Sequence, residues 1–582
     1  RPATPPISQA FGVEAVTGRS RMPLNLLPEM AGEAARRVLA GPRIFWRRSW
    51  FYRRLLKGPL SDRVVFHPYD ALPRRLDDAD ALLHGKFRFG GETVEVKDGS
   101  VFDKPAPSQA WEEALHGFAW LPPLSAAGGD PARTLATNLI SQWMKRNARY
   151  DEPASSAQVL AHRLIHIFAH GRIVLSNSDM LWRSKVFVSL REQSRLLARI
   201  CEEAPDGLPR YEAAAAVALS GACLADTKRL EAGLARLEAE IARQILPDGG
   251  HVSRSPEALV HAYRLATMVM DALIAISHPV SHEMHSARDR MAPMLRFFRH
   301  GDGALALFNG GQECDGRMIA GLLARDEVRG QPFGHARHSG YQRLAAGRSV
   351  MMMDCGAPPP GPFSTNAHAG CLAFEFSSGI HRIVVNCGAA VDARRATWDS
   401  ALRATAAHST MTLADTTTGA ILAGGWSRRL LGPRLIGGVS QVDTQRIETS
   451  EGWLVEGGHD GYVAPFGVRH ERQVMLSTRG LILTGLDRLL PAGKTRRQAL
   501  PFALRFHIHP DVRMSPSQGG DVILKLPNGE GWRFRADVPV AVEESVYLGG
   551  DVLRRCEQLV LAGAVADKPV EIAWVFEQIE RD

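Results

Sequence analysis

Lysine, paired cysteines and long apolar runs are all scarce in this sequence. Only ten of the 582 residues are lysine, so arginine supplies 60 of the 70 basic side chains. The seven cysteines are scattered and never spaced as Cys-x-x-Cys, which excludes a zinc ribbon and a disulfide scaffold and predicts mostly free, buried thiols. No apolar run reaches the length of about 18 residues typical of a transmembrane helix, so no transmembrane segment is expected.

The composition is that of an ordinary globular protein, with 45% hydrophobic and 23% charged residues. Wholesale disorder is therefore excluded, and the length is enough for roughly two to four domains. P-loops, Rossmann fingerprints and nucleophile elbows are absent. The net charge of +8 suits an anionic partner, because the arginine fork pairs with carboxylates and phosphates. An arginine-rich composition with no such partner explains the charge equally well.

Residues 1–104 are expected to form an N-terminal arm followed by a small hairpin with Gly90-Gly91 at its turn. Within residues 33–58, eight basic residues face a single acid, Glu33, and five aromatic residues lie among the arginines. Two interpretations remain open. The segment is a basic aromatic helix that lies on an anionic membrane or on nucleic acid, or its aromatic side chains dock on the protein while its arginines stay solvated. The second is favoured, and no nucleic-acid partner is expected.

Hydrophobic periodicity divides the rest of the chain. Residues 105–300 show helical periodicity interrupted by Pro, Gly and Asp-Gly, which predicts antiparallel helical hairpins in series. Residues 301–339 form a junction. Residues 340–582 alternate between apolar and polar positions and turn at glycines, which predicts antiparallel sheets packed as a sandwich. The fold class is therefore an α+β multidomain protein, with helices first and a β-sandwich second.

Several motifs in the second half resemble those of the heparinase II/III-like family of polysaccharide lyases. They are Asn366-Ala-His368, Phe374-Glu375-Phe376, His381 to Asn386-Cys-Gly388, Arg403-Ala-Thr405 with His408-Ser-Thr410, the segment 458–463, and Gly485-Leu-Asp487. The resemblance implies an (α/α) toroid joined to an antiparallel β-sandwich, with a site in the cleft between them. It also implies β-elimination of an acidic, uronate-containing polysaccharide and a periplasmic location, although no signal peptide is visible in this chain.

Three residues of these motifs are candidate metal ligands. His368, Asn386 and His408 lie on or beside strands expected to be neighbours, so their side chains can converge on one face. Imidazoles suit zinc, and catalytic zinc sites use three protein ligands and an open position. Family members with zinc use His, Asp and His here, whereas this chain has Asn386 at the Asp position. The alternative to a zinc site is a hydrogen-bonded His–Asn–His cluster that holds the sheet.

The lyase reaction needs a base, an acid for the leaving oxygen, and a group that neutralises the uronate carboxylate. In the family, one toroid helix supplies an Asn-His pair and another supplies a Tyr. Here Arg210 and Tyr211 stand at the pair, and the Tyr position falls on Ala258. The candidate substitutes are His251, Tyr211 and Tyr263 as catalytic groups and Arg254 and Arg210 as substrate-binding groups.

Three further residues have two possible roles each. Asn366 is a candidate catalytic neutraliser of the carboxylate, or a turn residue that caps a strand. Arg403 is a candidate clamp for the uronate, or it forms a salt bridge with Asp399 or Glu375. Tyr462 is a candidate substrate-binding residue, or part of the sandwich core.

Two functions follow from these observations. The first is a lyase that cleaves an acidic polysaccharide by β-elimination. The second, motivated by the missing Asn-His pair and the displaced Tyr, is a catalytically weak or inactive saccharide-binding protein on the same scaffold. A homodimer is possible in either case.

Overall fold

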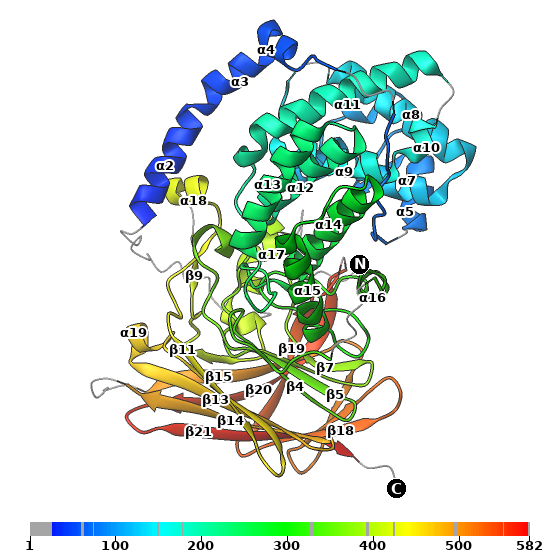
Figure 1. Cartoon of the computed structure of the whole chain (residues 1–582). Coiled ribbons are helices and arrows are strands. Elements are labelled where there is room, and N and C mark those ends of the chain that lie inside the picture. Colours follow the sequence, from blue (N-terminus) through cyan, green and yellow to red (C-terminus); the bar gives the residue numbers. More distant parts are fainter. Residues whose placement is uncertain are drawn as a thin grey trace.

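The computed structural model describes residues 26–59, 63–73, 75–147, 150–176, 179–325, 331–390, 395–422, 425–492, 499–550 and 552–579. The helical half precedes the β half, as the sequence predicts, and the two lie one above the other (Figure 1).

The first half is built of helices that follow one another as hairpins (Figure 1). They are α6 (Gln109–His116), α7 (Leu121–Ala127), α8 (Gly129–Arg146), α9 (Ala157–His170), α10 (Arg172–Leu175), α11 (Met180–Ile200), α12 (Leu208–Cys223), α13 (Thr227–Gln244), α14 (Pro256–Ala275) and α15 (His282–Phe297). Six of them begin at a serine or aspartate whose side chain accepts a hydrogen bond from a first-turn N–H, a donor that the helix leaves unpaired. These caps are Ser108, Ser156, Asp179, Asp226, Ser255 and Ser281.

Helix α12 forms the centre of this half. All its side chains from Tyr211 to Cys223 are buried, and it contacts α9, α13 and α14. Glycines bring α13 unusually close. A Cβ on Gly221 would lie 2.3 Å from the backbone nitrogen of Leu230, and one on Gly233 would lie 2.3 Å from that of Ala218. Small residues therefore set the distance between the two helices.

Three helices precede this half and form what we call the N-terminal arm: α2 (Leu27–Val38), α3 (Ala40–Arg48) and α4 (Trp50–Leu55). Leu39 joins α2 and α3 in a helical conformation, with φ −78° and ψ −11°. The arm runs along the outside of the molecule, from α18 (Gly425–Leu431) to the far end of the helical half (Figure 1). Helix α5 (Leu76–Leu83) follows, and then the hairpin of β1 (Lys86–Phe89) and β2 (Glu92–Glu95), which turns at Gly90-Gly91 as predicted.

The second half is a sandwich of two antiparallel sheets (Figure 1). The first has the order β11 (Val442–Glu448), β12 (Gly452–His459), β13 (Val468–Ser477), β14 (Ile482–Pro491), β21 (Val570–Ile579), β18 (Gly531–Ala536), β17 (Val522–Lys525) and β16 (Arg513–Pro516). The second has the order β19 (Val540–Tyr547), β20 (Arg554–Val565), β15 (Leu500–Ile508), β7 (His381–Val385), β6 (Phe374–Ser378), β5 (Ser349–Asp354), β4 (Tyr341–Ala346) and β3 (His335–Ala336), and β8 (Met411–Leu413) also pairs with β15.

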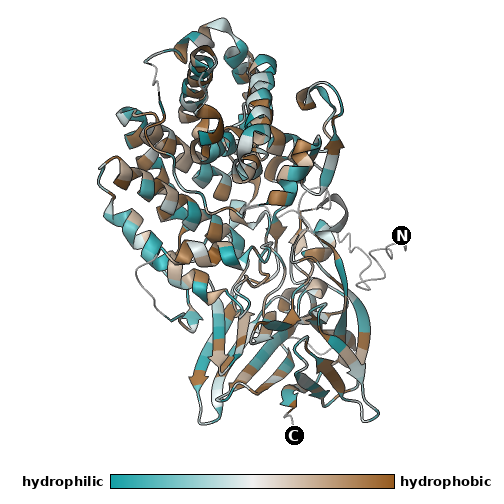
Figure 2. Ribbon diagram, turned by 90° about the vertical axis from the view of Figure 1, so that its right-hand side faces the viewer, coloured by the Kyte–Doolittle hydropathy of each residue, from teal (hydrophilic) through white to brown (hydrophobic). Residues whose placement is uncertain are grey.

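Alternation along the strands explains why the two sheets pack together. Strand β13 buries every second residue, and bands of opposite hydropathy alternate along the long strands (Figure 2). The inward side chains form one apolar core, in which the rings of Phe374 and Trp574 stack with centroids 5.5 Å apart. Short helices interrupt the β half at α16 (Gly316–Leu323), α17 (Arg395–Leu402), α18 and α19 (Val463–Phe466).

Arg254 joins the two halves. It lies in the loop before α14, and its guanidinium donates to four carbonyl oxygens of the β half, those of Ser339, Gly340, Gly356 and Ala357, at 2.7 to 3.1 Å. The remaining donor meets the carboxylate of Asp354. The guanidinium lies over the ring of Tyr341, with its Cζ 4.7 Å from the ring centroid. The Tyr341 hydroxyl donates to the Arg254 carbonyl at 2.7 Å. All five donors of this arginine are therefore used within the protein.

One described helix, α14, is long and apolar enough to cross a membrane, but 72% of its most apolar window is buried inside the molecule. Its burial against α12 and α15 accounts for its composition, because a helix inside a large protein is apolar all round.

We expect Gly233→Ala to lower the free energy of unfolding by about 1–3 kcal/mol, because the added methyl group meets the α12 backbone. Gly321→Ala is the matched control, since Gly321 lies in α16 with no atom within 4 Å of the added Cβ. That control should be neutral or stabilising by up to about 1 kcal/mol. Urea unfolding followed by circular dichroism measures both. Equal effects of the two substitutions would contradict the close approach of α12 and α13.

We expect Arg254→Met to lower the free energy of unfolding by about 3–5 kcal/mol, because it leaves Asp354 buried without its cation. The exposed Arg337, in the turn between β3 and β4, supplies the control: Arg337→Met should stay within about 0.5 kcal/mol of the parent. Urea titration reports both values. Unchanged stability of Arg254→Met would show that Arg254 does not hold the two halves together.

Candidate functional site

His368 and His408 form a buried pair, and His368 lies beside Arg254 of the helical half. His368 precedes β6, and His408 follows the short helix Thr405–Ala407. The Nδ1 of His408 donates to the Ala404 carbonyl at 2.8 Å, so its Nε2 accepts the proton of His368 Nδ1 at 3.0 Å. Burial lowers the pKa of His408 to about 4. The His408 imidazole is therefore neutral at pH 7.

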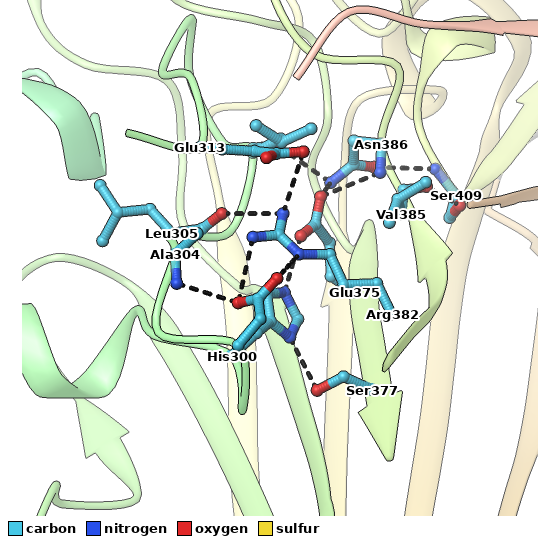
Figure 3. A network of polar contacts seen from close by, with 12 residues as sticks. His300, Ala304, Leu305, Glu313, Glu375, Ser377, Arg382, Val385, Asn386 and Ser409 are labelled. Carbon is cyan, nitrogen blue, oxygen red and sulfur yellow. Dashed lines mark hydrogen bonds and ion pairs between the residues drawn. The ribbon is translucent and has the colours of Figure 1, made fainter. Parts of the chain in front are cut away.

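Asn386, the third predicted ligand, directly follows β7 and is fully buried. Its Oδ1 accepts the backbone N–H of Ser409 at 3.0 Å, and its Nδ2 donates to the Leu307 carbonyl and to Glu375 at 3.1 and 3.3 Å (Figure 3). The amide oxygen already has a partner, and no group of three or more His, Cys, Asp or Glu among the described residues could hold a metal. The Asn386 amide thus joins Leu307, Glu375 and Ser409, while His368 pairs with His408; the amide oxygen that a zinc site would need already accepts a hydrogen bond.

A second buried network joins the junction to the sandwich (Figure 3). His300 donates from Nε2 to Glu375 at 2.9 Å, and its Nδ1 accepts from Ser377 Oγ at 2.8 Å. Burial lowers the pKa of His300, so the ring is neutral with its proton on Nε2. Arg382 pairs with Asp302 at 2.9 Å beside it. These side chains hold the junction against β6 and β7.

The predicted acid and base groups of the helical half are buried and hydrogen-bonded internally. The phenol of Tyr211 donates to the Ala262 carbonyl at 3.2 Å, and burial raises its pKa. Tyr263 is the next residue along α14 and is also buried. His251 donates from Nε2 to Gln244 at 2.9 Å, its Nδ1 lies 2.7 Å from Ser253 Oγ, and burial lowers its pKa to about 4.

The structure places Arg403 and Tyr462 inside the β half. Arg403 donates to the carbonyls of Ala367 and Ser364 at 2.9 and 3.3 Å and meets Asp399 at 3.3 Å. Tyr462 donates to the Met411 carbonyl at 2.9 Å within the sandwich core.

Nine of the eleven predicted site residues are buried. The two with solvent exposure are Asn366, which is exposed, and Arg210, which is half-buried and paired with Asp206 at 2.6 Å. His368, Arg254 and Asp354 line a cavity of only about 10 Å³, which has room for about one water molecule. A sugar ring does not fit there.

A much larger cavity, of about 560 Å³, lies in the helical half between α4, α8, α9 and α11. Its lining includes four aromatic residues and four cations but a single acid, Glu192. The aromatic residues are Tyr52, Trp143, Tyr150 and Trp182, and the cations are Arg47, Lys145, Arg163 and Lys185. None of the lining residues belongs to the site predicted from the sequence.

Arg163 is the most deeply buried cation of this cavity. Its guanidinium donates to the carbonyls of His116 and Ala154 and to Gln193 Oε1, at 2.6 to 2.9 Å, and lies 4.2 Å from the Trp143 ring. Burial lowers its pKa to about 9. The sequence offered one indication of this buried cation: Arg163 interrupts an otherwise apolar face of the segment 157–168.

We expect the free energy of unfolding to fall as pH falls from about 6.5 to 4. Burial holds the pKa of both His408 and His251 at about 4, against 6.5 in the unfolded chain. In this pH window the unfolded chain therefore binds protons that the folded chain does not. Each histidine lowers the free energy of unfolding by up to roughly 3 kcal/mol across the window. Urea unfolding at a series of pH values measures the slope.

His408→Gln should flatten this slope, whereas His84→Gln, at a side chain that is 69% exposed, should leave it unchanged. Identical pH dependence of His408→Gln and the parent would contradict a neutral, buried His408.

Comparisons with known proteins agree with the fold. The family model described as "Heparinase II/III-like, C-terminal" matches residues 328–575. A curated relative from Caulobacter vibrioides, named FtsZ-localized protein C, is 32% identical over 92% of this chain and 94% of its own length.

Among solved structures, heparinase III has a TM-score of 0.67 at 14% identity, covering 99% of this chain and 94% of that one. A heparan sulfate lyase mutant from Pedobacter heparinus has a TM-score of 0.60 at 14% identity, covering 91% and 88%. At this identity the likeness shows the fold, a helical toroid followed by a β-sandwich. With the motifs at His368, Asn386 and His408 and the relative aligned over nearly its whole length, the chain belongs to the heparinase II/III-like family.

Proposed function

We propose that this protein binds an acidic polysaccharide on the lyase fold without cleaving it by β-elimination. One observation carries the proposal: nine of the eleven predicted site residues are buried, and the cavity beside His368 has a volume of about 10 Å³. A uronate cannot reach these groups in this arrangement.

The chemistry leads to the same conclusion. β-Elimination needs a base that reaches the proton α to the uronate carboxylate, and an acid that reaches the leaving oxygen. The phenol of Tyr211 donates to a buried carbonyl, and the Nδ1 of His251 lies against Ser253. Arg254 is a candidate for binding the substrate, but all five of its N–H donors are hydrogen-bonded to oxygens of the protein.

The cavity between α4, α8, α9 and α11 supplies a better place for an acidic saccharide. Aromatic rings offer flat apolar faces on which sugar rings can pack, and polar groups at the rim fix a ligand's orientation. Lys145 and Lys185 are exposed at this cavity, so their ammonium groups can pair with carboxylates or sulfates. The volume of about 560 Å³ is within the usual range for ligand pockets, about 300–1,000 Å³.

A lyase remains the second candidate, because His408 is neutral and pairs with His368, which follows the exposed Asn366 by two residues. Two of the solved structures with this fold are heparan sulfate lyase and heparinase III. In that function, opening of the small cavity would let His408 act as a base, while Asn366 binds the carboxylate.

Purified protein and a panel of uronate polymers test both functions. Elimination leaves a conjugated double bond in the uronate, which absorbs in the ultraviolet. We expect no rise in absorbance but measurable binding by calorimetry, weakened by salt because exposed charges are screened beyond about 8 Å at physiological ionic strength. Lys185→Glu and Trp182→Ala should each weaken binding about ten-fold or more.

The control is Lys228→Glu, since Lys228 is an exposed lysine of α13 outside this cavity, and it should bind nearly as the parent does. An absorbance rise that His408→Ala abolishes would establish the lyase instead. Absence of binding to every polymer, or binding that Lys185→Glu and Trp182→Ala leave unchanged, would overturn the proposed saccharide site.

A further inference from the structure

The N-terminal arm exposes large apolar side chains to solvent. Phe45 is 81% exposed, Trp50 62%, Phe51 65% and Trp46 51%. Of the five aromatic residues in this segment, only Tyr52 is buried. The interpretation favoured from the sequence, in which the aromatic side chains dock on the protein, is therefore wrong for four of them.

These side chains form one stripe along the arm. Val38 and Leu39, 75% and 51% exposed, precede Phe45 and Trp46 by seven residues, and residues seven apart lie on the same face of a helix. The helical conformation of Leu39 makes α2 and α3 a nearly continuous rod, and α4, which follows the extended residue Ser49, exposes Trp50 and Phe51. The exposed apolar surface is thus continuous rather than scattered, which marks an interaction surface.

Basic side chains flank the stripe. Arg36, Arg37, Arg43 and Arg54 are all exposed, and Glu33 is the single acid in residues 33–58. Arg54 lies 5.4 Å from the ring centroid of Trp50, so charge and aromatic surface adjoin.

The other side of the arm is fixed to the helical half. Arg47 forms an ion pair with Glu203, Arg48 meets Asp151 at 2.7 Å, and Arg199 donates to the Leu55 carbonyl at 3.2 Å. Because these contacts hold the arm, its outward face is already ordered before a partner binds, and less conformational entropy is lost on binding.

We propose that the arm binds the surface of an anionic lipid bilayer. Basic residues beside Trp, Phe and aliphatic side chains are the composition of helices that lie in the interfacial plane, with the apolar face about 5–10 Å deep. Exposed Val38 and Leu39 suit acyl chains, whereas nucleic acid offers stacking for rings but no apolar phase for aliphatic groups. A second copy of this chain, which carries a net charge of +8, would bring like charges together. The proposal is independent of the saccharide site.

Vesicle flotation with the full chain tests this surface. We expect binding to vesicles of equimolar phosphatidylcholine and phosphatidylglycerol, and much weaker binding to phosphatidylcholine alone. The variant Phe45→Ser/Trp46→Ser/Trp50→Ser/Phe51→Ser should lose about ten-fold or more of the vesicle affinity with an unchanged circular dichroism spectrum, because these side chains are exposed. Arg36→Glu/Arg43→Glu should lose binding to the anionic vesicles in particular.

The matched control is Met180→Ser/Leu181→Ser, since these residues are 75% and 78% exposed at the start of α11, away from the arm. It should bind vesicles as the parent does. Failure of the parent to bind anionic vesicles, or equal binding by the four-residue variant, would overturn the proposal. So would arm-dependent binding of a single-stranded oligonucleotide without vesicle binding, or a dimer that the four-residue variant dissociates without any vesicle binding by the parent.

Discussion

A buried arginine couples the two halves, alongside the network of His300, Glu375 and Arg382. Arg254 belongs to the helical half by sequence, yet all its donors end on oxygens of the β half. A buried guanidinium is tolerated only when its donors are satisfied and its charge is paired. The turn at Gly356 is shaped around it, since a Cβ there would lie 2.5 Å from the arginine Nη2. The loop before α14, and with it the start of α14, is therefore held in place by hydrogen bonds to the β half.

The need to pair every buried polar group also explains why a substrate cannot enter the predicted site. Asn386, Arg403 and Tyr462 each have polar groups that a substrate could use, but in this chain those groups satisfy buried backbone partners. A group that holds the fold in this way cannot turn to a ligand without leaving a buried polar atom unpaired, which is expensive. The polar residues of the motifs thus act as structural groups, and the larger, cation-lined cavity lies elsewhere.

Local patterns were sufficient to predict the order of elements. The change from helical to alternating periodicity near residue 300, the hairpin at Gly90-Gly91 and the resemblance around His368 all have counterparts in the structure. The strands expected beside His368 and Asn386, β6 and β7, are neighbours, whereas β8, which follows His408, pairs with β15. The sequence could not show which polar groups are already hydrogen-bonded within the protein. Arg254 meets partners 85 to 103 residues away, and the large cavity combines residues of five helices that share no motif.

The N-terminal arm has two faces with different neighbours. Arg47, Tyr52 and Leu56 form part of the wall of the large cavity, while Phe45, Trp46 and Trp50 face solvent. The segment from Phe45 to Leu56 therefore lines the cavity on one side and faces solvent on the other. Any displacement of that stretch changes the shape of the cavity, and any occupant that presses on the wall changes the position of the outer rings. By thermodynamic reciprocity, if a ligand inside alters the affinity of a contact outside, that contact alters the affinity of the ligand by the same factor.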